Sequence, residues 1–467
     1  MTSQKLKLKE KIGYGFGDAA SSIFWKLFSM YLMFFYTDIF GIPAALVGTM
    51  FLITRIWDAA FDPFVGILGD RTETRWGKFR PYLLWVAVPF GIIGVLTFTT
   101  PSFTQSGKVI YAFVTYSLMM MVYSMINVPY ASLMGVMTAD GKERTTLATF
   151  RFIFAFGGSL LVLALAEPLV NIFSKLGKGG ENLQLGWQLA AIVFALIAIS
   201  FFLLTFSWTR ERIKPVTVKT SLKKDLNDLL HNSPWFILLG AGVSAIFFNS
   251  IRDGAAIYYF KYYIQGQSAF SINVINLTIT LSSLYFVLGQ AANILGVILA
   301  KPVSDRIGKK YTFLYAMLFA SVFSVAFYWL NRNSVSLIFV FQFLISMSAG
   351  IIFPLVWSMY ADTADYSEWK TGRRATGLVF SASSMSQKFG WTLGGALAGW
   401  LLGYYGFKAN VVQTVEAQTG IRMMLSFFPA VGTILGAIFM FIYPLSEKAM
   451  TKISRELAER RELANTD

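Results

Sequence analysis

The segment TRWGKFRPYLLWVAVPFGIIGVLTFTTP, residues 74–101, decides the class of fold. Its first part is basic, and no charged residue follows between Pro81 and Pro101. A helix that crosses a bilayer needs about 20 consecutive, mostly apolar residues. The segment therefore predicts a transmembrane helix that is preceded by a basic loop.

The rest of the chain repeats this pattern. The protein has 467 residues, of which 55% are hydrophobic and 14% charged, and its mean hydropathy is +0.56. Because soluble domains carry about 25% charged residues, we predict an all-α membrane protein. Its twelve apolar runs lie at residues 14–38, 42–68, 81–101, 109–137, 147–173, 186–208, 234–263, 273–300, 311–330, 334–360, 375–406 and 422–445.

Basic residues are unevenly distributed around these runs. Most of the 40 Lys and Arg residues lie in the two tails and the even-numbered loops, which marks them as cytoplasmic. We therefore expect a multi-pass protein of the cell (inner) membrane with both termini in the cytoplasm. Contact of this basic face with anionic lipid explains the net charge of +15 without nucleic acid as a partner. The only Lys and Arg residues of the odd-numbered loops are Lys108, Lys175, Lys178, Arg332 and Lys408.

Several kinds of site are excluded by composition. The chain has no Cys and one His, His231, so it cannot form disulfides, thiolate metal sites or the usual His-based catalytic sites. We expect His231 to be a solvated loop residue. The N-terminal residues do not resemble a cleavable signal peptide. Since no catalytic triad or phosphate loop is present either, we do not expect an enzyme.

Two motifs recur about half a chain apart and predict two related halves. Residues 69–80 resemble residues 304–310, and Thr-Ala-Asp occurs at 138–140 and at 363–365. Repeated halves with a binding site between them are a known transporter design. The predicted parts are an N-terminal six-helix bundle (1–208), a cytoplasmic linker (209–233), a C-terminal six-helix bundle (234–445) and a cytoplasmic tail (446–467).

Two acids in the second span are the clearest pointer to function. A charge at bilayer depth costs at least a few kcal/mol unless it has a partner or lines a water-filled cavity. Asp58 and Asp62 lie one helical turn apart on one face. They repel each other unless a cation lies between them or one of them holds a proton. This predicts a site for a coupling ion, a metal site if the ion is Na⁺; the alternative is an internal ion pair with Arg55 or Lys26.

Asp18 in the first span predicts a contact with solute. Ser22 lies one turn above it and Lys26 two turns above, all on the same face. We expect the first two helices to present this mixed group of charges to a common cavity. Lys26 either pairs with Asp58 or Asp62 or meets an anionic group of the substrate.

Other polar and aromatic residues complete the candidate set. Asn127 in the fourth span is a neutral oxygen donor beside the proline break at Pro129. A buried Arg or Lys near carboxylates either clamps a substrate or forms a salt bridge, and Arg and carboxylates both hydrogen-bond vicinal hydroxyls. The candidates for such roles are Arg151, Arg252 and Lys388. Ser384 is a further candidate for contact with substrate, and Tyr130 and Trp391 are aromatic side chains that would stack on a sugar face.

Five motifs carry a resemblance to a known family that covers nearly the whole chain. They are YGFGD at 14–18, YLMFFYTDIFGI at 31–42, RIWDAAFDP at 55–63, TRWGKFRP at 74–81 and NVPYASLMGVMTAD at 127–140. These motifs resemble the glycoside–pentoside–hexuronide:cation symporter family of the major facilitator superfamily. The resemblance implies the major facilitator fold. It also implies that Asp58 and Asp62 bind the cation, with Ser124 and Asn127 assisting from the fourth helix.

The same resemblance bears on the solute. Arg151 is similar to a sugar-contacting Arg of the family, and Lys388 matches a family Lys on the eleventh helix. The melibiose permease has an Asp where this chain has Asn127, which leaves Na⁺ and H⁺ both open. Its acid that holds galactoside hydroxyls falls at Ser22 here, with Asp18 one turn away, so a preference for galactosides is not implied.

Together these features predict a secondary transporter. We expect cation-coupled symport (Na⁺ or H⁺) of a small glycoside, pentoside or hexuronide into the cytoplasm by alternating access. The carrier would act as a monomer in the lipid bilayer, with no cofactor besides the ion. The solute would bind near the midplane between the halves, and the loops at 70–80 and 301–310 would close the inner gate. The alternatives are a non-transporting solute sensor and a lipid or drug carrier on the same fold.

Overall fold

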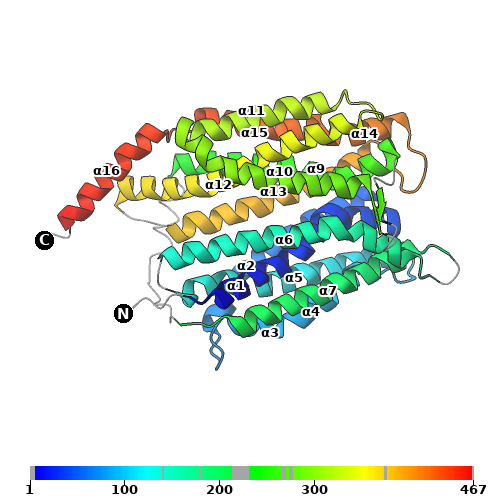
Figure 1. Cartoon of the computed structure of the whole chain (residues 1–467), viewed down its shortest axis with the longest axis horizontal. Coiled ribbons are helices and arrows are strands. Elements are labelled where there is room, and N and C mark those ends of the chain that lie inside the picture. Colours follow the sequence, from blue (N-terminus) through cyan, green and yellow to red (C-terminus); the bar gives the residue numbers. More distant parts are fainter. Residues whose placement is uncertain are drawn as a thin grey trace. The chain divides into compact units, whose positions relative to one another are not determined.

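A computed structural model of the protein consists almost wholly of helices in the part of the chain that it describes (Figure 1). One short ribbon interrupts them, in which β1 (Phe270–Ile272) pairs antiparallel with β2 (Leu277–Ile279). The structure describes residues 6–138, 141–177, 180–212, 231–265, 270–272, 277–372 and 376–464.

Twelve helical segments of the described chain match the twelve predicted spans in order. Eight are single helices: α2 (Ala44–Arg71), α5 (Gln105–Met137), α6 (Gly141–Ser174), α7 (Leu183–Trp208), α10 (Leu281–Ile307), α11 (Lys309–Phe327), α12 (Val335–Thr371) and α13 (Thr376–Tyr404). Four are composite: α1 (Leu8–Leu27) with the π-helices η1 (Phe28–Leu32) and η2 (Phe35–Ile39), α3 (Arg80–Trp85) with α4 (Ala87–Thr97), α9 (Ser233–Tyr258) with the π-helix η3 (Tyr259–Ile264), and α14 (Val415–Leu425) with α15 (Phe427–Ile442). The tail forms α16 (Glu447–Ala464).

The composition of these helices fits a bilayer. Within the described residues, eight helices are long and apolar enough to cross a membrane by length and composition alone. Most predicted boundaries hold to within about four residues; larger differences occur at the starts of α1, α6, α10 and α14 and at the ends of α10 and α12. The eighth span, expected from residue 273, begins as a helix at Leu281, and α12 continues to Thr371 rather than ending near residue 360.

The chain divides into two compact units. Unit 1 comprises Met1–Thr217, Ala256–Val287 and Gly399–Gln418. Unit 2 comprises Val218–Ala255, Leu288–Ala398 and Thr419–Asp467. Unit 1 therefore holds the first six spans together with the last residues of α9 and α13, the segments that follow them and the first residues of α10 and α14. Most of the predicted linker, residues 213–230, lies outside the described residues.

In unit 1, α1 packs closely against α6 and α7. The contact with α6 depends on Gly158, because a Cβ atom there would lie 2.5 Å from the carbonyl oxygen of Ala19 and 3.0 Å from its Cα. These are backbone atoms of a packed helix, so they cannot move aside. The neighbouring Gly157 has open space around its Cβ position.

We predict that Gly158→Val destabilises the protein by about 1–3 kcal/mol, because overpacking forces the two helices apart. Gly157→Val is the matched control, since it adds the same side chain one residue away in open space. The measurement is the thermal unfolding of both purified variants in detergent. Equal melting temperatures for the two variants would show that α1 and α6 do not meet as described.

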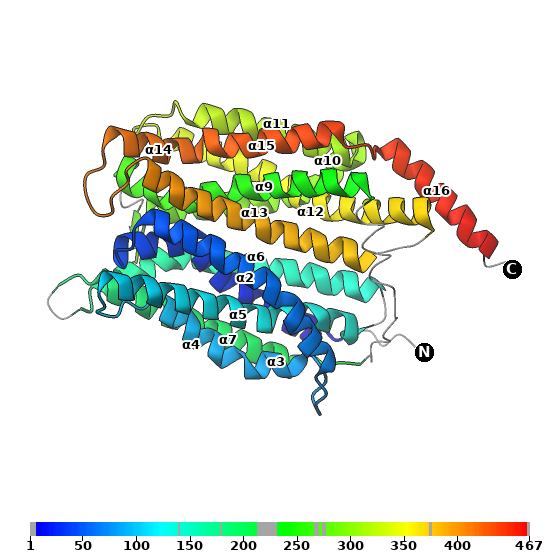
Figure 2. The ribbon, with the colours of Figure 1, turned by 180° about the vertical axis from the view of Figure 1, so that it is seen from behind.

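Unit 2 is built in a similar way around its own close contact. Gly296 on α10 and Gly350 on α12 pack against each other's helices, and a Cβ atom at either position would lie 2.1 Å from a carbonyl oxygen, that of Met347 or Asn293. Beyond this contact α12 continues beside α16, where Trp369 Nε1 donates to a carboxylate oxygen of Glu456 at 2.6 Å (Figure 2).

The repeated motifs of the two halves both form tight turns that contain a glycine in the left-handed region. Gly77 has φ +111° and Gly308 has φ +83°. In unit 1, the Glu211 carboxylate accepts hydrogen bonds from the backbone N–H groups of residues 78–80, at 2.7–2.9 Å. In unit 2, Lys309 pairs with Asp362 at 2.8 Å. Both turns are thus fixed by a charged side chain.

Candidate functional site

Asp58 and Asp62 of α2 meet Ser124 of α5 in unit 1. Asp58 is buried, with 2% of its surface exposed, whereas Asp62 is half-buried. The Ser124 hydroxyl oxygen lies 2.8 Å from Asp58 Oδ1 and 2.6 Å from Asp62 Oδ1. A hydroxyl has one proton to donate. Ser124 can therefore satisfy one carboxylate at a time, and the second contact needs a proton on a carboxyl group or a cation among the oxygens.

Arg55 gives Asp58 a fixed positive neighbour. Its Nη1 atom lies 3.6 Å from Asp58 Oδ2, longer than a charge-assisted hydrogen bond. The guanidinium group also lies 4.8 Å from the centre of the Trp25 ring. The ion pair that was the alternative explanation for the acids is thus present, but the pair recorded for Arg55 is with Asp58. Asp62 is more exposed than Asp58, which favours it as the acid that gains and loses a cation.

We predict that Ser124→Ala weakens apparent affinity for the coupling ion by roughly tenfold to a hundredfold, the value of a hydrogen bond to a charged group. Ser124→Thr keeps the hydroxyl and should remain close to wild type. Ser117→Ala removes a hydroxyl from the same helix, where the contact with Thr54 is only 3.5 Å, and serves as the control. The measurement is the ion concentration that half-saturates solute uptake; an unchanged value in Ser124→Ala would exclude this role.

Asn127 follows Ser124 by about one turn of α5 but makes its recorded hydrogen bonds elsewhere. Its Oδ1 atom accepts from the Ser21 hydroxyl of α1 at 2.8 Å, and its amide nitrogen donates to the carbonyl oxygen of Tyr123 at 3.0 Å. In this state the side chain ties α5 to α1. Direct ligation of the cation by Asn127 stays a prediction.

Asp18 and Arg151 form an ion pair between α1 and α6. Arg151 Nε lies 3.0 Å from Asp18 Oδ2, and its guanidinium group lies 5.5 Å from the centre of the Tyr130 ring. Tyr130 is fully buried and stacks on Tyr14 with ring centres 4.8 Å apart. Gly17 permits this packing, because a Cβ atom there would lie 2.3 Å from the Tyr130 ring. Tyr130 therefore supports Arg151 in this state.

The other candidates of unit 1 lie on α1. Ser22 and Lys26 are half-buried and follow Asp18 at intervals of one turn. The neighbouring Trp25 ring lies against the Arg55 guanidinium group, so the first two helices approach each other here. A common cavity for their charged residues stays a prediction. Contact of Ser22 or Lys26 with solute stays a prediction.

Unit 2 contributes candidates from α13. Lys388 and Trp391 are half-buried, and the Trp391 carbonyl accepts a hydrogen bond from Ser250 at 3.2 Å. The side chain of Ser384 lies outside the described residues. Arg252 is buried and donates to Gln342 of α12 at 2.8 Å and to a backbone carbonyl of α14. Arg252 thus joins helices within unit 2, and a cavity role for it stays a prediction.

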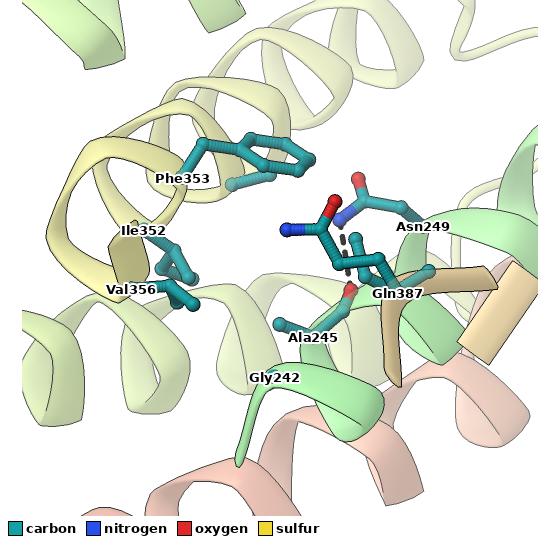
Figure 3. Close-up of a pocket in the computed structure, with 9 residues that line it drawn as sticks. Gly242, Ala245, Asn249, Ile352, Phe353, Val356 and Gln387 are labelled. Carbon is teal, nitrogen blue, oxygen red and sulfur yellow. Dashed lines mark hydrogen bonds between the residues drawn. The ribbon is translucent and has the colours of Figure 1, made fainter. Parts of the chain in front are cut away.

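A small pocket, which the sequence did not predict, lies between α9, α12 and α13 in unit 2 (Figure 3). The amides of Asn249 and Gln387 enter it, and Asn249 donates to the carbonyl oxygen of Ala245 at 2.9 Å. Apolar side chains from α12, among them Phe353, form the opposite wall. An Asn and a Gln inside apolar spans were the available signal, but they carry no charge and so did not stand out.

Solved structures of membrane transporters have a fold similar to that of this chain. A structure described as giving insights into substrate recognition in proton-dependent oligopeptide transporters matches with a TM-score of 0.68 over 96% of this chain and all of that one, at 10% identity. Likeness at that identity concerns the fold alone. The chain has the fold of polytopic membrane transporters, as expected from the resemblance to the major facilitator superfamily.

The family follows from the sequence itself. Residues 13–447 match the MFS/sugar transport protein family, and the chain belongs to it. It is 38% identical over 463 residues to the inner membrane symporter YicJ of Escherichia coli K12, covering 98% of this chain and 96% of the relative. The putative glycoside/cation symporter YagG of the same organism is 38% identical over 459 residues, with the same coverage. The isoprimeverose transporter of Lactiplantibacillus pentosus is 37% identical over 463 residues, covering 98% of this chain and 93% of the relative.

These comparisons confirm the resemblance to sugar–cation symporters. They also confirm that the protein is a transporter and not an enzyme. In the described part of the chain, no group of three or more His, Cys, Asp and Glu residues is arranged to hold a metal ion.

Proposed function

We propose that the protein is a symporter that imports a small sugar, namely a glycoside, pentoside or hexuronide, together with Na⁺ or H⁺. Membership of the family supports this, as do relatives named as a glycoside/cation symporter and an isoprimeverose transporter. The name of YicJ supports a location in the inner membrane. The distribution of Lys and Arg supports cytoplasmic termini.

The observation that carries the proposal is the single hydroxyl shared by two acids. Asp58 and Asp62 both lie within hydrogen-bond distance of Ser124, which has one proton for the two contacts. One further positive charge, H⁺ or Na⁺, completes the arrangement. Its departure leaves two carboxylates that repel each other in a medium of low dielectric constant.

Such a site couples ion and solute through the conformational states of the carrier. An ion that binds one state more tightly than another shifts the equilibrium between them by that difference in affinity. If the solute prefers the same state, each ligand raises the affinity for the other by the same factor. Binding at Asp58 and Asp62 would thus favour the solute-binding state, and loss of the ion in the cytoplasm would favour release.

The ion pair of Asp18 with Arg151 is the proposed solute contact in unit 1. A carboxylate and a guanidinium group make charge-assisted hydrogen bonds with hydroxyls, which are stronger than bonds between neutral groups. The Tyr130 ring lies 5.5 Å from the guanidinium group of this ion pair and supports it. Neutral or acidic sugars with adjacent hydroxyls are therefore the expected substrate class. Lys388 and Trp391 are the proposed contributors from unit 2.

The test is a panel of labelled sugars offered to vesicles that contain the purified protein, with Na⁺ and H⁺ gradients imposed separately. We expect one gradient to drive a glycoside, pentoside or hexuronide above its outside concentration. Vesicles without protein give the background. Binding of a sugar without accumulation under either gradient would contradict symport and favour a sensor.

A further inference from the structure

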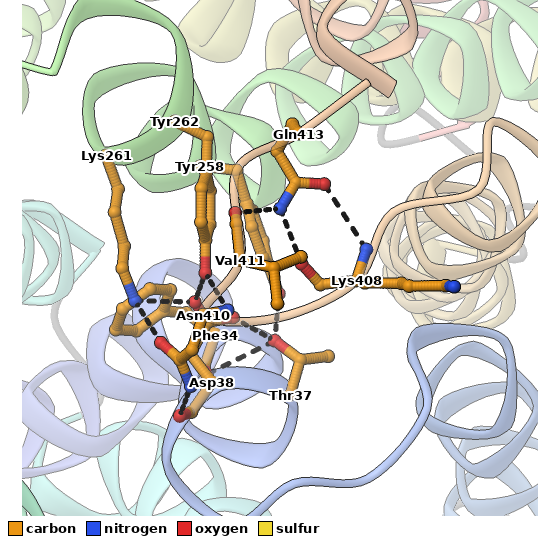
Figure 4. Close-up of polar contacts among 10 residues, drawn as sticks. All are labelled: Phe34, Thr37, Asp38, Tyr258, Lys261, Tyr262, Lys408, Asn410, Val411 and Gln413. Carbon is orange, nitrogen blue, oxygen red and sulfur yellow. Dashed lines mark hydrogen bonds and ion pairs between the residues drawn. The ribbon is translucent and has the colours of Figure 1, made fainter. Parts of the chain in front are cut away.

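Asp38 lies at the centre of a polar cluster at the end of the first span in unit 1 (Figure 4). Its carboxylate is fully covered, yet it accepts a hydrogen bond from Lys261 Nζ at 2.7 Å and another from the Tyr262 hydroxyl. The Thr37 hydroxyl adds a third, at 2.6 Å. A buried acid in this position needs these partners, because a buried charge without compensation is strongly destabilising.

Asn410 closes the cluster from a third segment. Its side-chain nitrogen donates to the backbone carbonyl of Asp38 at 2.6 Å, its Oδ1 accepts from Lys261 at 2.8 Å, and its backbone N–H donates to the Tyr262 hydroxyl at 2.9 Å. Asn410 has φ +60°, a conformation that Asn adopts more readily than most residues. Figure 4 shows the three segments converging on Asp38.

The helix ends that meet here share an unusual geometry. Asp38 belongs to the π-helix η2, and Lys261 and Tyr262 belong to the π-helix η3. π-Helical turns are rare and occur frequently at functional sites. The ammonium group of Lys261 also lies 4.8 Å from the centre of the Phe34 ring of the first span. The contact is therefore a specific junction between residues that are 223 positions apart in sequence.

A second acid makes an equivalent junction in the same unit. Glu167 of α6 accepts hydrogen bonds from the hydroxyls of Thr280 at 2.5 Å and Ser282 at 2.6 Å. Thr280 caps the first turn of α10, since its hydroxyl accepts from the backbone N–H of Ser283 at 3.1 Å. A carboxylate at a helix N-terminus is favoured by the helix dipole. As at Asp38, an acid of the first six spans binds donors of the second half.

α2 and α13 are also in close contact, through residues that lie near Asp38 and Asn410 in sequence. A Cβ atom at Gly399 would lie 2.8 Å from Gly48, and one at Gly403 would lie 3.0 Å from the Cβ of Ala45. Trp400 Nε1 donates to the Thr49 hydroxyl at 3.0 Å. Segments from both halves of the sequence are thus held in direct contact at three places in unit 1.

We propose that Asp38, Lys261, Asn410 and Glu167 form an outer latch, which holds the carrier closed toward the outside and opens to admit solute. This proposal rests on the proposed function, because alternating access requires segments of the two halves to part on one side at a time. Polar contacts suit such a latch. Their groups exchange protein partners for water when they separate, so the net free-energy difference per hydrogen bond is small.

The natural absence of Cys provides a direct test. A protein with Ala45→Cys and Gly403→Cys reports the closed state, because the two Cβ atoms would lie 3.0 Å apart and a shift of about 0.5 Å brings them into the disulfide range of about 3.5–4.5 Å. In membranes, without solute or ion gradient, we expect rapid oxidative cross-linking in this background. Addition of Asp38→Asn should slow cross-linking at least about tenfold, because the half-buried Lys261 loses its ion partner.

Two further variants make the outcome specific. The charge swap Asp38→Lys with Lys261→Asp should restore cross-linking to within about threefold of the background, since an ion pair is re-formed. Glu459→Gln removes an acid from an exposed ion pair of α16 in unit 2 and should leave the rate unchanged. If Asp38→Asn does not reach the membrane, Glu167→Gln replaces it, with the same slowing expected.

An unchanged cross-linking rate in Asp38→Asn, or in Glu167→Gln where that replaces it, would overturn the latch. A slowed rate that the charge swap fails to restore would overturn the ion pair as its basis. Because neither solute nor an ion gradient is present, these results do not depend on accumulation of solute by symport.

Discussion

Asp58→Asn and Asp62→Asn are each expected to abolish ion-driven accumulation of solute while the protein remains in the membrane. An Asn side chain keeps the size of Asp but carries no charge, so the site no longer holds a cation between two acids. We expect the initial rate of gradient-driven uptake to fall to the background of vesicles without protein. The measurement is uptake of the sugar identified by the panel, under the gradient that drives it.

The two variants are not equivalent. Asp58 is the partner of Arg55, so its replacement also leaves a guanidinium group poorly compensated and should lower thermal stability. Asp62→Asn is therefore the cleaner test. Glu459→Gln, which removes the acid of an exposed ion pair on α16, is the control for loss of an acid elsewhere. Normal accumulation in both Asp58→Asn and Asp62→Asn would remove the acid pair from the mechanism.

Asp18→Asn and Arg151→Lys are expected to weaken binding of the transported sugar at least about tenfold, or about 1.4 kcal/mol. Arg151 binds Asp18 and lies against the Tyr130 ring at the same time. A Lys ammonium group lacks the planar fork that makes both contacts, so this exchange is not conservative. The measurement is equilibrium binding of labelled sugar to the purified protein.

The control for this prediction is Arg332→Lys, which makes the same exchange in an exposed turn of unit 2. Half-saturation by the coupling ion should change little in Asp18→Asn, because the acid pair on α2 is intact. A sugar affinity equal to that of wild type in both Asp18→Asn and Arg151→Lys would place the solute site elsewhere.

Regular patterns made much of the fold predictable. Apolar runs of bilayer length located the twelve helical segments, because a segment in lipid must pair all its backbone N–H and C=O groups in internal hydrogen bonds, as a helix does. The eighth span was the exception, since hydropathy does not distinguish a short apolar strand from a helix. Residues 277–279, Leu-Thr-Ile, are rich in the β-branched side chains that strands favour.

The candidate site was predictable where it depends on local spacing. Asp58 and Asp62 share a helix face because they are four residues apart, and that periodicity can be read directly from the chain. The contact of both acids with Ser124 came only from the family resemblance. No local pattern indicates which face of α5 packs on α2.

The latch residues show where the prediction failed. Asp38, Lys261 and Glu167 lie inside predicted spans, so the cost of a membrane-buried charge applied to them as it did to Asp58. That signal was present but was applied only to some of the spans. The pairing itself was not readable, because Asp38 and Lys261 are far apart in sequence and the π-helical turns that carry them have no sequence signature here.

Mutual dependence of ion and solute binding is the most direct test of the acid pair as the coupling site. Titration of the purified wild-type protein with sugar, at a low and at a saturating concentration of Na⁺ or H⁺, should show tighter sugar binding at the higher ion concentration. Titration with ion, at zero and saturating sugar, should show the same factor. In Asp62→Asn the sugar affinity should not change with the ion. A wild-type affinity that ignores both Na⁺ and H⁺, or a variant that keeps the full dependence, would contradict the mechanism.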